Sequence, residues 1–477
     1  MKRKRKNILL ENVLVESHAG EGRSLARIEG KVIFIDDAVP GDVVDVRLSR
    51  DKKDWAEGRA VHFHTYSSDR VAPFCEHFGT CGGCQWQMLP YEKQLEYKQR
   101  QVEDSLQRIG KIPFPVINPI IGAAENRYYR NKVEYTYGNK RFIPSSSFEE
   151  IKASGFENMP DSNAAGFHAR GFFDKVVDIN RCHLQAEPTN AIRLAIKDFV
   201  LSKNWEFYDI RQHTGFIRTV QLRLCRSGEL MVNIVIAEND ETKRRELLDH
   251  VAEKFPQITT LLYTINTKFN DSLYDLNPIA YTGKGYVIET LGDFRFKIGP
   301  KSFFQTNTKQ AERLYEVTRD YAGLTGSETV YDLYCGTGSI GIFLSKMAGK
   351  IIGVETVKEA IDDANENAAL NGLPHTSFFA GDVIDICDDS FFEAHGKPDV
   401  IITDPPRAGM HEKLGAKINE MEARTVVYVS CNPATQARDL NLLGEKYEVT
   451  QIQPVDMFPH TLHIENVVQL KLKKDLG

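Results

Sequence analysis

In the C-terminal third of the chain, apolar runs of strand length end directly in residues that can carry chemistry. Val426–Ser430 is followed by Cys431, and Asn432-Pro433 stops the run abruptly. A second run ends at Asp404, and a third, Val330–Leu333, leads into a glycine-rich loop. The carboxyl ends of parallel strands open into the crevice where α/β sheets bind ligands. We therefore expect a thiol, a carboxylate and a glycine loop to share one rim of a sheet.

Strand patterns alternate with helical patterns from about residue 299 onward, which predicts a doubly wound α/β domain. The apolar run 350–354 ends at Glu355. Thr356 and Glu359 then match a capping box, and Gly372 is placed to end the helix that they begin.

The glycine-rich loop follows the pattern of a nucleotide-binding turn. Gly336, Gly338 and Gly341 follow a strand and open a helix, and Glu355 ends the next strand 19 residues beyond Gly336. Glycines permit close approach of the backbone, and the acid can accept hydrogen bonds from ribose hydroxyls. The spacing also fits a nicotinamide cofactor, or glycines that only pack a helix against the sheet. The loop alone does not identify the cofactor.

Two further strand ends narrow the choice of cofactor. Asp382 suits contact with an adenine amino group, and Asp404 begins an Asp-Pro-Pro-Arg turn where the reactive end of a methyl donor is expected. Together with the glycine loop, these residues resemble a Rossmann-like methyltransferase that uses S-adenosylmethionine.

The chain has 477 residues, more than one hydrophobic core usually supports, so several domains are expected. We predict an N-terminal domain over 1–70, a strand-rich central domain over 71–298 and the α/β domain over 299–477. Short alternating strands and glycine turns in residues 8–65 are typical of a five-stranded OB-like barrel, although other small β-domains fit the pattern.

A helix is predicted over residues 91–109, with Gly110 after it, and it could pack on the α/β domain. Its expected apolar stripe consists of Leu95, Val102, Leu106 and Ile109. Residues 143–166 are rich in Ser, Asn and Glu and are expected to form a loop or flexible insertion.

The eight cysteines are too few and too scattered for a disulfide scaffold. Cys75, Cys81 and Cys84 lie close together in the sequence, which indicates a metal site. Three thiolates and one further ligand could hold zinc or an iron–sulfur cluster, and the spacing alone slightly favours zinc, because zinc sites are commoner.

Charge and hydropathy limit the functions that the chain can have. The net charge of −6 argues against a uniformly basic nucleic-acid binder, whereas residues 91–141 carry ten Lys and Arg against six Asp and Glu. That stretch could contact RNA or form a solvated helix face. No apolar segment is long enough to span a bilayer, and the first residues lack the apolar core of a secretory signal. We expect a cytoplasmic protein without a membrane partner.

Several motifs in order resemble the RNA uracil-5-methyltransferase family over nearly the whole chain. They are Ser302-Phe-Phe-Gln-Thr-Asn307, Asp332-Leu-Tyr-Cys-Gly-Thr-Gly338, Gly353-Val-Glu355, Asp404-Pro-Pro-Arg407, Val429-Ser-Cys-Asn-Pro433 and His463-Ile-Glu-Asn-Val-Val468. The N-terminal β-region resembles the TRAM domain of that family. Cys75, Cys81 and Cys84 resemble its iron–sulfur motif, with Cys182 as the fourth ligand, which favours a [4Fe–4S] cluster over zinc.

The resemblance implies a role for each candidate residue. Cys431 is the nucleophile that adds to C6 of uracil, and Glu465 removes the proton from C5. The residues expected to line the S-adenosylmethionine pocket are Gln305, Tyr334, Gly336, Glu355, Asp382 and Asp404. Position 339 is Ser where some relatives carry Asn, so no side-chain contact is assigned there.

The implied substrate is a uridine that is looped or flipped out of RNA, because a helix hides C6. The architecture resembles the branch that methylates 23S ribosomal RNA, and a uridine of the transfer RNA T-loop is the alternative. No obligate protein partner is inferred. An amino-methyltransferase, which needs no thiol, and an RNA-binding redox sensor without catalysis are rival functions.

Overall fold

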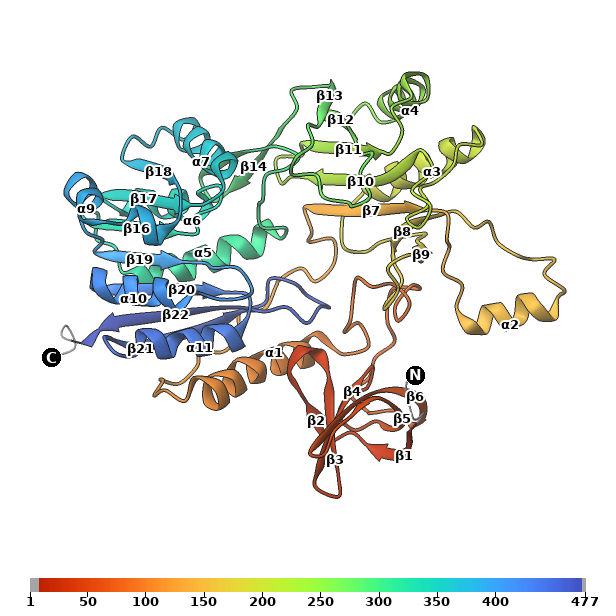
Figure 1. Cartoon of the computed structure of the whole chain (residues 1–477), viewed down its shortest axis with the longest axis horizontal. Helices are drawn as coiled ribbons and strands as arrows, with labels where there is room; N and C mark the ends of the chain where they lie inside the picture. Colours follow the sequence, from red (N-terminus) through yellow and green to blue (C-terminus); the bar gives the residue numbers. More distant parts are fainter. Residues whose placement is uncertain (1–7, 474–477) are drawn as a thin grey trace, which may run out of the picture.

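The computed structural model describes residues 8–473, which form three large sheets and one two-stranded sheet (Figure 1). The N-terminal sheet has the strand order β1-β5-β6-β4-β3-β2 around an apolar core that includes Val13, Ile35 and Val44. The strands are β1 Leu9–Leu14, β2 Ser17–His18, β3 Ser24–Ile28, β4 Lys31–Asp36, β5 Val43–Asp51 and β6 Trp55–Thr65, with a 3-10 turn at Gly20–Gly22. The sheet has six strands where five were expected. Within residues 8–473 the edge strands β1 and β2 are not paired with each other, so a closed barrel is not confirmed.

Helix α1, Tyr91–Ser105, leads out of the cysteine-rich segment and continues as a π turn over Leu106–Gly110. The predicted helix is therefore present, but the predicted stripe is only partly correct. Val102 and Leu106 are buried against the C-terminal domain, whereas Ile109 lies in the π turn and is 44% exposed. Polar side chains of α1 are buried instead.

The central domain is a seven-stranded sheet with the order β13-β12-β11-β10-β7-β8-β9. Its strands are β7 Lys132–Gly138, β8 Ala164–His168, β9 Val176–Asp178, β10 Ile217–Leu224, β11 Leu230–Ile236, β12 Thr260–Ile265 and β13 Ile279–Thr282. Helices α3, Thr189–Ser202, and α4, Glu241–Lys254, pack their apolar sides into the same core as one face of this sheet. The expected loop over 143–166 contains a short helix, α2, Ser145–Ala153, so that expectation was wrong for these residues.

The C-terminal domain is the doubly wound α/β fold that the sequence predicts. Its sheet has the order β18-β17-β16-β19-β20-β22-β21, in which β22 alone runs antiparallel to both of its neighbours. The strands are β16 Thr329–Leu333, β17 Lys350–Glu355, β18 Thr376–Ala380, β19 Val400–Thr403, β20 Thr425–Ser430, β21 Tyr447–Val455 and β22 Glu465–Leu472. The helices are α5 Thr308–Ala322, α6 Ser339–Leu344, α7 Lys358–Leu370, α8 Val383–Ile386, α9 Asp389–His395, α10 Glu412–Met421 and α11 Pro433–Leu443, with a 3-10 turn at Ser345–Met347.

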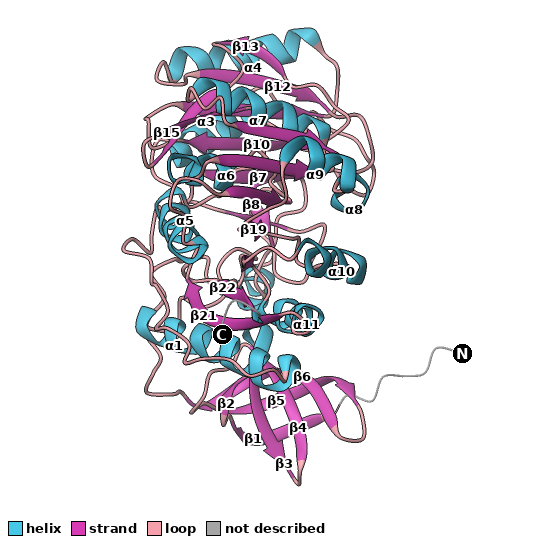
Figure 2. Ribbon diagram, turned by 90° about the vertical axis from the view of Figure 1, so that its left-hand side faces the viewer, coloured by secondary structure: helices cyan, strands magenta, loops and turns pink. Residues whose placement is uncertain are grey.

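Alternate side chains of the C-terminal sheet enter two different apolar cores. Val330 and Ile402 pack with α5, α6 and α7, whereas Tyr331 and Ile401 pack with α1, α10 and α11. A two-stranded hairpin, β14 Val287–Leu291 and β15 Phe294–Ile298, contributes its apolar side chains to the first of these cores. Figure 2 shows the C-terminal and central sheets stacked above the N-terminal sheet.

Local signals mostly act as the sequence indicates, with one exception at α7. Thr356 does not cap the helix; its hydroxyl donates to Glu355 Oε1 at 2.9 Å, and α7 begins two residues later. The predicted capping box is therefore wrong. Within residues 8–473 no helix combines the length and the apolar character needed to cross a bilayer.

Candidate active site and cysteine pocket

The strand order of the C-terminal sheet arranges the candidate residues along one rim. Five parallel strands each end at a candidate residue or one to two residues before it. In spatial order the strands are β18, β17, β16, β19 and β20, and their candidate residues are Asp382, Glu355, Tyr334, Asp404 and Cys431. Adjacent strands lie about 4.8 Å apart. The rim therefore runs from the expected nucleoside end of the site to the thiol in single-strand steps.

The antiparallel strand β22 brings Glu465 beside Cys431. Ser430 at the end of β20 is the register partner of Asn466 on β22. In an antiparallel pair the next residue of one strand meets the preceding residue of the other. Cys431 therefore faces Glu465, although 34 residues separate them in the chain (465 − 431). Sequence reasoning paired these residues only through the family resemblance.

The acidic surroundings of Cys431 keep its thiol protonated. Burial raises the pKa of Cys431 to about 12, and the charges of Glu465 and Asp404 contribute, while Arg407 opposes them. Burial also raises the pKa of Asp404 to about 7. Burial and the neighbouring Asp404 raise the pKa of Glu465 well above its ordinary value. The charge of Asp404 thus disfavours ionisation of Glu465, beyond the effect of burial.

Asn432 and Pro433 shape the thiol loop. Asn432 caps α11 by accepting from Ala434 N, and Pro433 occupies the first helical turn, where its missing N–H costs nothing. The Asn432 amide also donates to Arg407 O at 3.0 Å, and the Thr435 hydroxyl donates to the same oxygen at 3.2 Å. These bonds fasten the loop after β20 to the loop after β19. Asn432 and Arg407 are site residues to which the sequence assigned no role.

The glycine loop contains positions that only small residues can occupy. Gly336 has φ +52° and open space where a Cβ would project, which leaves room for a ligand to approach the backbone. Gly338 has φ +73°, and a Cβ there would meet the ring of Phe378 at 2.8 Å, so this glycine serves packing. Tyr334 also has a positive φ, +61°, uncommon for a bulky residue and found most often at functional turns.

A second loop, residues 302–306, closes over the glycine loop. The Thr337 hydroxyl donates to Phe303 O at 3.3 Å, and the Asn131 amide of the central domain donates to Gln305 O at 2.9 Å. Gln305 is half-buried between the two domains. Of the remaining candidates, Glu355 accepts from Val357 N, and Asp382 accepts from Ile384 N as the cap of α8. Each keeps a second carboxylate oxygen that could meet a ligand.

The segment before Glu465 is held by helix α1. Lys98 donates to Asp456 Oδ1 at 2.7 Å in an ion pair whose side chains are fully buried, and the Tyr91 hydroxyl donates to Asp456 Oδ2 at 2.8 Å. His460 N donates to Gln94 Oε1 at 2.9 Å. These contacts explain why polar residues of α1 are buried. They also fix residues 456–460, five residues before the candidate base.

The cysteine-rich segment reaches the same place. The backbone N–H groups of Gln85 and Trp86 donate to His460 O at 2.8 and 3.1 Å. Cys84 immediately precedes this pair in the chain. The cysteine loop and α1 thus hold the segment before Glu465 from both sides, a relation that no local sequence signal predicts.

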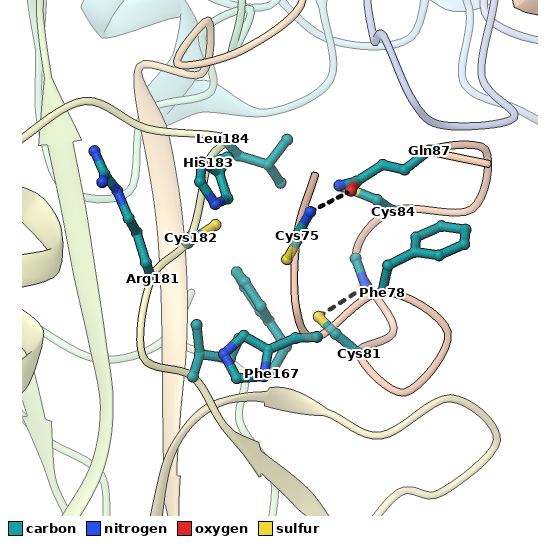
Figure 3. A pocket seen from close by; sticks show the side chains of 13 residues that line it. Cys75, Phe78, Cys81, Cys84, Gln87, Phe167, Arg181, Cys182, His183 and Leu184 are labelled. Carbon is teal, nitrogen blue, oxygen red and sulfur yellow. Dashed lines mark hydrogen bonds between the residues drawn. The ribbon is translucent and has the colours of Figure 1, made fainter. Parts of the chain in front are cut away.

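The four candidate cysteine ligands line one pocket (Figure 3). Cys75, Cys81 and Cys84 come from the loop before α1, and Cys182 comes from the loop before α3, where Asn190 bonds both its N–H and its carbonyl. The pKa values of Cys81 and Cys84 are raised to about 12 and about 11, mainly by burial and further by neighbouring cysteines. Thiols gathered in this way favour a ligand that accepts thiolates.

The pocket does not have the geometry of a single-ion site. Among the described residues 8–473, no group of three or more His, Cys, Asp or Glu is arranged to hold a metal ion. The expectation of a bound metal is therefore not confirmed, although the structure does bring the four predicted cysteines together.

A cleft is lined both by residues of this pocket and by the loop over the glycine turn. Gly83, Phe167 and Leu184 line both cavities. The cleft also has the cationic side chains of Arg130, Lys132 and Arg223 and the exposed ring of Phe303.

Sequence families match three parts of the chain. The family described as tRNA (Uracil-5-)-methyltransferase matches residues 389–473, the methyltransferase small domain matches 319–424 and the TRAM domain matches 11–61. A protein of Bacteroides thetaiotaomicron named as an uncharacterized RNA methyltransferase is 49% identical over 95% of this chain and all of its own length. A protein of Chlorobaculum tepidum with the same description is 39% identical over 98% of this chain and 96% of its own.

A solved structure agrees over the same extent. The tRNA (uracil-54, C5)-methyltransferase of Pyrococcus abyssi, in complex with S-adenosyl-L-homocysteine, superimposes with a TM-score of 0.74 at 26% identity. The match covers 96% of this chain and all of the Pyrococcus chain.

Proposed function

The chain belongs to the uracil-5 family of RNA methyltransferases, and from this premise we propose that it methylates C5 of a uridine in RNA. S-adenosylmethionine would supply the methyl group, as the S-adenosyl-L-homocysteine in the Pyrococcus relative supports. The single observation that carries the reaction type is the register of β20 against β22, which places a thiol beside a buried carboxyl at the cofactor rim.

The chemistry requires a nucleophile, because C5 of uracil is unreactive until a group adds to C6. In the proposed mechanism Cys431 first loses its proton, its Sγ thiolate bonds to C6 and the electron pair of the C5–C6 bond moves into an enolate. C5 then accepts the methyl group. Glu465 removes the remaining C5 proton, the S–C6 bond breaks and the thiolate leaves.

The electrostatics of the site fit an ordered reaction. Burial raises the pKa of Asp404 and of Glu465, so a carboxylate at either position is a stronger base for the C5 proton than an exposed carboxylate would be. Cys431 directly precedes the N-cap of α11, whose N-terminal partial positive charge favours a thiolate, whereas burial and the neighbouring carboxyls favour the protonated thiol.

The cofactor would be held by the glycine loop and the rim. Gly336 allows the backbone to approach it, and Glu355 and Asp382 are placed to accept hydrogen bonds from ribose hydroxyls and an adenine amino group. Tyr334, Gln305 and Asp404 would line the rest of the cofactor pocket.

We further propose that the cysteine pocket holds a [4Fe–4S] cluster. Four thiols around one pocket fit the ligand set of such a cluster. The contacts of Gln85 and Trp86 with His460 indicate a structural role, in which the cluster stabilises the segment before Glu465.

We propose a 23S ribosomal RNA uridine as the substrate and the cytoplasm as the place of action. The T-loop of transfer RNA is the second candidate, favoured by the likeness to the Pyrococcus enzyme for uracil 54 of tRNA. The experiment is incubation with labelled S-adenosylmethionine and, in separate reactions, unmodified ribosomal and transfer RNA, followed by mapping of 5-methyluridine. Label in ribosomal RNA alone supports the proposal, label in transfer RNA alone selects the second candidate, and label at a base nitrogen refutes both.

A further inference from the structure

The candidate base Glu465 begins β22, and its place depends on the loop that joins β21 to β22. Val455 at the end of β21 is the register partner of Glu465, so residues 456–464 form a hairpin loop between the two strands. The strand pairing continues only on the C-terminal side of Glu465, because the residue before it already belongs to the loop. The contacts that hold this loop therefore bear on the position of the carboxyl.

The middle of the hairpin loop has a backbone conformation that needs support. Thr461 N donates to Phe458 O at 3.2 Å, which closes a β-turn with Pro459 and His460 at its centre. Proline at the second position suits a type II turn, whose third residue has a positive φ and is usually glycine or asparagine. His460 occupies that third position with φ +64°. A residue with a Cβ is strained there and persists because its surroundings hold it.

Gln94 of helix α1 supplies a large part of that hold. Its side chain is fully buried, and its Oε1 accepts from His460 N at 2.9 Å while its Nε2 lies 3.1 Å from His460 Nδ1. The same Nε2 donates to Leu89 O at 2.9 Å and to Trp86 O at 3.0 Å. One side chain thus joins the turn at His460 to the segment that follows the cysteine loop.

Other side chains of α1 hold the start of the hairpin loop rather than its middle. Lys98 and Tyr91 both donate to the Asp456 carboxylate. Gln94 instead binds the residue whose backbone is strained. Without the two bonds from Gln94 the turn at His460 would relax toward negative φ and redirect the chain that follows. The bonds to Asp456 would not prevent this, since they act four residues earlier in the chain (460 − 456).

The path from the turn to the candidate base is short. His463 N donates to Thr461 Oγ1 at 3.3 Å, and the same hydroxyl donates to Phe458 O at 2.8 Å, so the residues after His460 are tied back to the turn. Glu465 follows two residues after His463. A general base must lie within hydrogen-bond reach of the proton that it removes, and a misplacement of about 1 Å can cost about 100-fold in rate.

We infer that Gln94 is a positioning residue: by holding the turn at His460 it sets the place of Glu465, and thereby the rate at which the C5 proton is removed. The inference rests on the proposed function, in which Glu465 is that base. Addition of Cys431 to C6 and transfer of the methyl group precede proton removal, and the thiol is held by bonds of Asn432 between the loops after β19 and β20. Loss of Gln94 should therefore slow the last step.

The test compares Gln94→Met with the wild type as full chains, on unmodified ribosomal or transfer RNA, whichever the wild type methylates. Because methyl transfer is irreversible, kcat/KM for RNA reports the steps up to it and should stay within about twofold, whereas kcat should fall about 10- to 100-fold. The methylated adduct, with Cys431 Sγ still bonded to C6 and the proton still on C5, should accumulate as a protein–RNA complex on denaturing gels. Deuterium at C5 of the target uridine should lower kcat of the variant by a larger factor than kcat of the wild type.

Gln99→Met is the matched control on the same helix, because the Gln99 amide bonds Glu103 and Asn118 O instead. It should keep the kcat, the isotope effect and the adduct level of the wild type. If Gln94→Met does not fold, Gln94→Glu is measured in its place; it keeps the oxygen that accepts from His460 N, and changes in the same direction are expected.

A folding defect has a different signature from a misplaced base. It reduces the amount of active enzyme, so kcat and kcat/KM fall together and the isotope effect does not change. That result for the Gln94 variant, or a wild-type kcat without extra adduct, would overturn the inference. A wild type that forms no 5-methyluridine refutes the proposed function and the inference with it, whereas normal methylation beside a Gln94 variant with the wild-type isotope effect refutes the role of Gln94 alone.

Discussion

The protonated state of Cys431 in the free enzyme yields a prediction that can be worked out in numbers. Its pKa of about 12, against an ordinary 9.0, lowers the thiolate fraction at pH 8 about 1,000-fold. A more basic thiolate is a better nucleophile, with a Brønsted coefficient of about 0.4 to 0.5, which returns roughly 15- to 30-fold of that loss. Exchange with a small neutral disulfide should therefore be roughly 30- to 60-fold slower at Cys431 than at a free cysteine.

The assay is exchange with bis(2-hydroxyethyl) disulfide from pH 7 to pH 10, quenched in acid and quantified on the Cys431 peptide by mass spectrometry. Restricted access to the thiol slows the exchange equally at every pH. The decisive quantity is therefore the slope of the logarithm of the exchange rate against pH. The rate should rise about tenfold per pH unit over the whole range, whereas an ordinary thiol levels off near pH 9. Glu465→Gln removes one charge that raises the pKa of Cys431, so its profile should level off at lower pH. Glu448→Gln, at an exposed position on β21, is the control. Levelling of the wild-type rate below pH 9 would refute the reasoning.

Three further predictions concern stability and the cysteine pocket. Lys98→Met leaves Asp456 charged in a fully buried position and should lower the free energy of unfolding by about 3 to 5 kcal/mol. Lys93→Met, which breaks only exposed ion pairs, should leave the unfolding midpoint close to that of the wild type in the same urea titration. Cys81→Ser should abolish the broad visible absorbance of the cluster in protein purified without oxygen, and retained absorbance would exclude Cys81 as a ligand. Burial lowers the pKa of His460 to about 4 from 6.5. The stabilisation that the folded state gains from holding His460 neutral is complete above pH 6.5. It should be lost as the pH falls to 4, which lowers the free energy of unfolding by about 3 kcal/mol in all. His460→Gln should flatten that acid limb of the unfolding curve, and an unchanged limb would contradict the burial argument.

The parts of the site that sequence could predict depend on local rules. Strand ends carry functional residues in doubly wound sheets, and this rule alone assigns Asp404, Tyr334 and Cys431 to one rim. The glycine loop and α11 follow from local signals of the same kind. These features are encoded within a few residues of where they act.

The relations that sequence could not predict are long-range. Glu465 meets Cys431 only because β22 inserts antiparallel between β20 and β21, a pairing that the apolar pattern of β22 does not specify. The hydrophobic stripe predicted for α1 was only partly correct for a similar reason. Lys98 and Gln94 look like solvent-facing residues until their partners at 456 and 460 are brought against them. Cys182 was predicted as the fourth ligand of the cysteine pocket from the family resemblance alone.

The covalent bond between Cys431 and a pyrimidine ring is the central claim, and a mechanism-based trap tests it most directly. RNA transcribed with 5-fluorouridine is incubated with the enzyme and S-adenosylmethionine, digested with nuclease and trypsin, and analysed by mass spectrometry. Because fluorine at C5 cannot leave as a proton, Glu465 cannot complete the reaction and the adduct should persist. We predict a methylated 5-fluorouridine nucleotide on the Cys431 peptide in near-stoichiometric yield. Normal methylation of ordinary RNA by an enzyme that forms no such adduct on Cys431 would contradict the account.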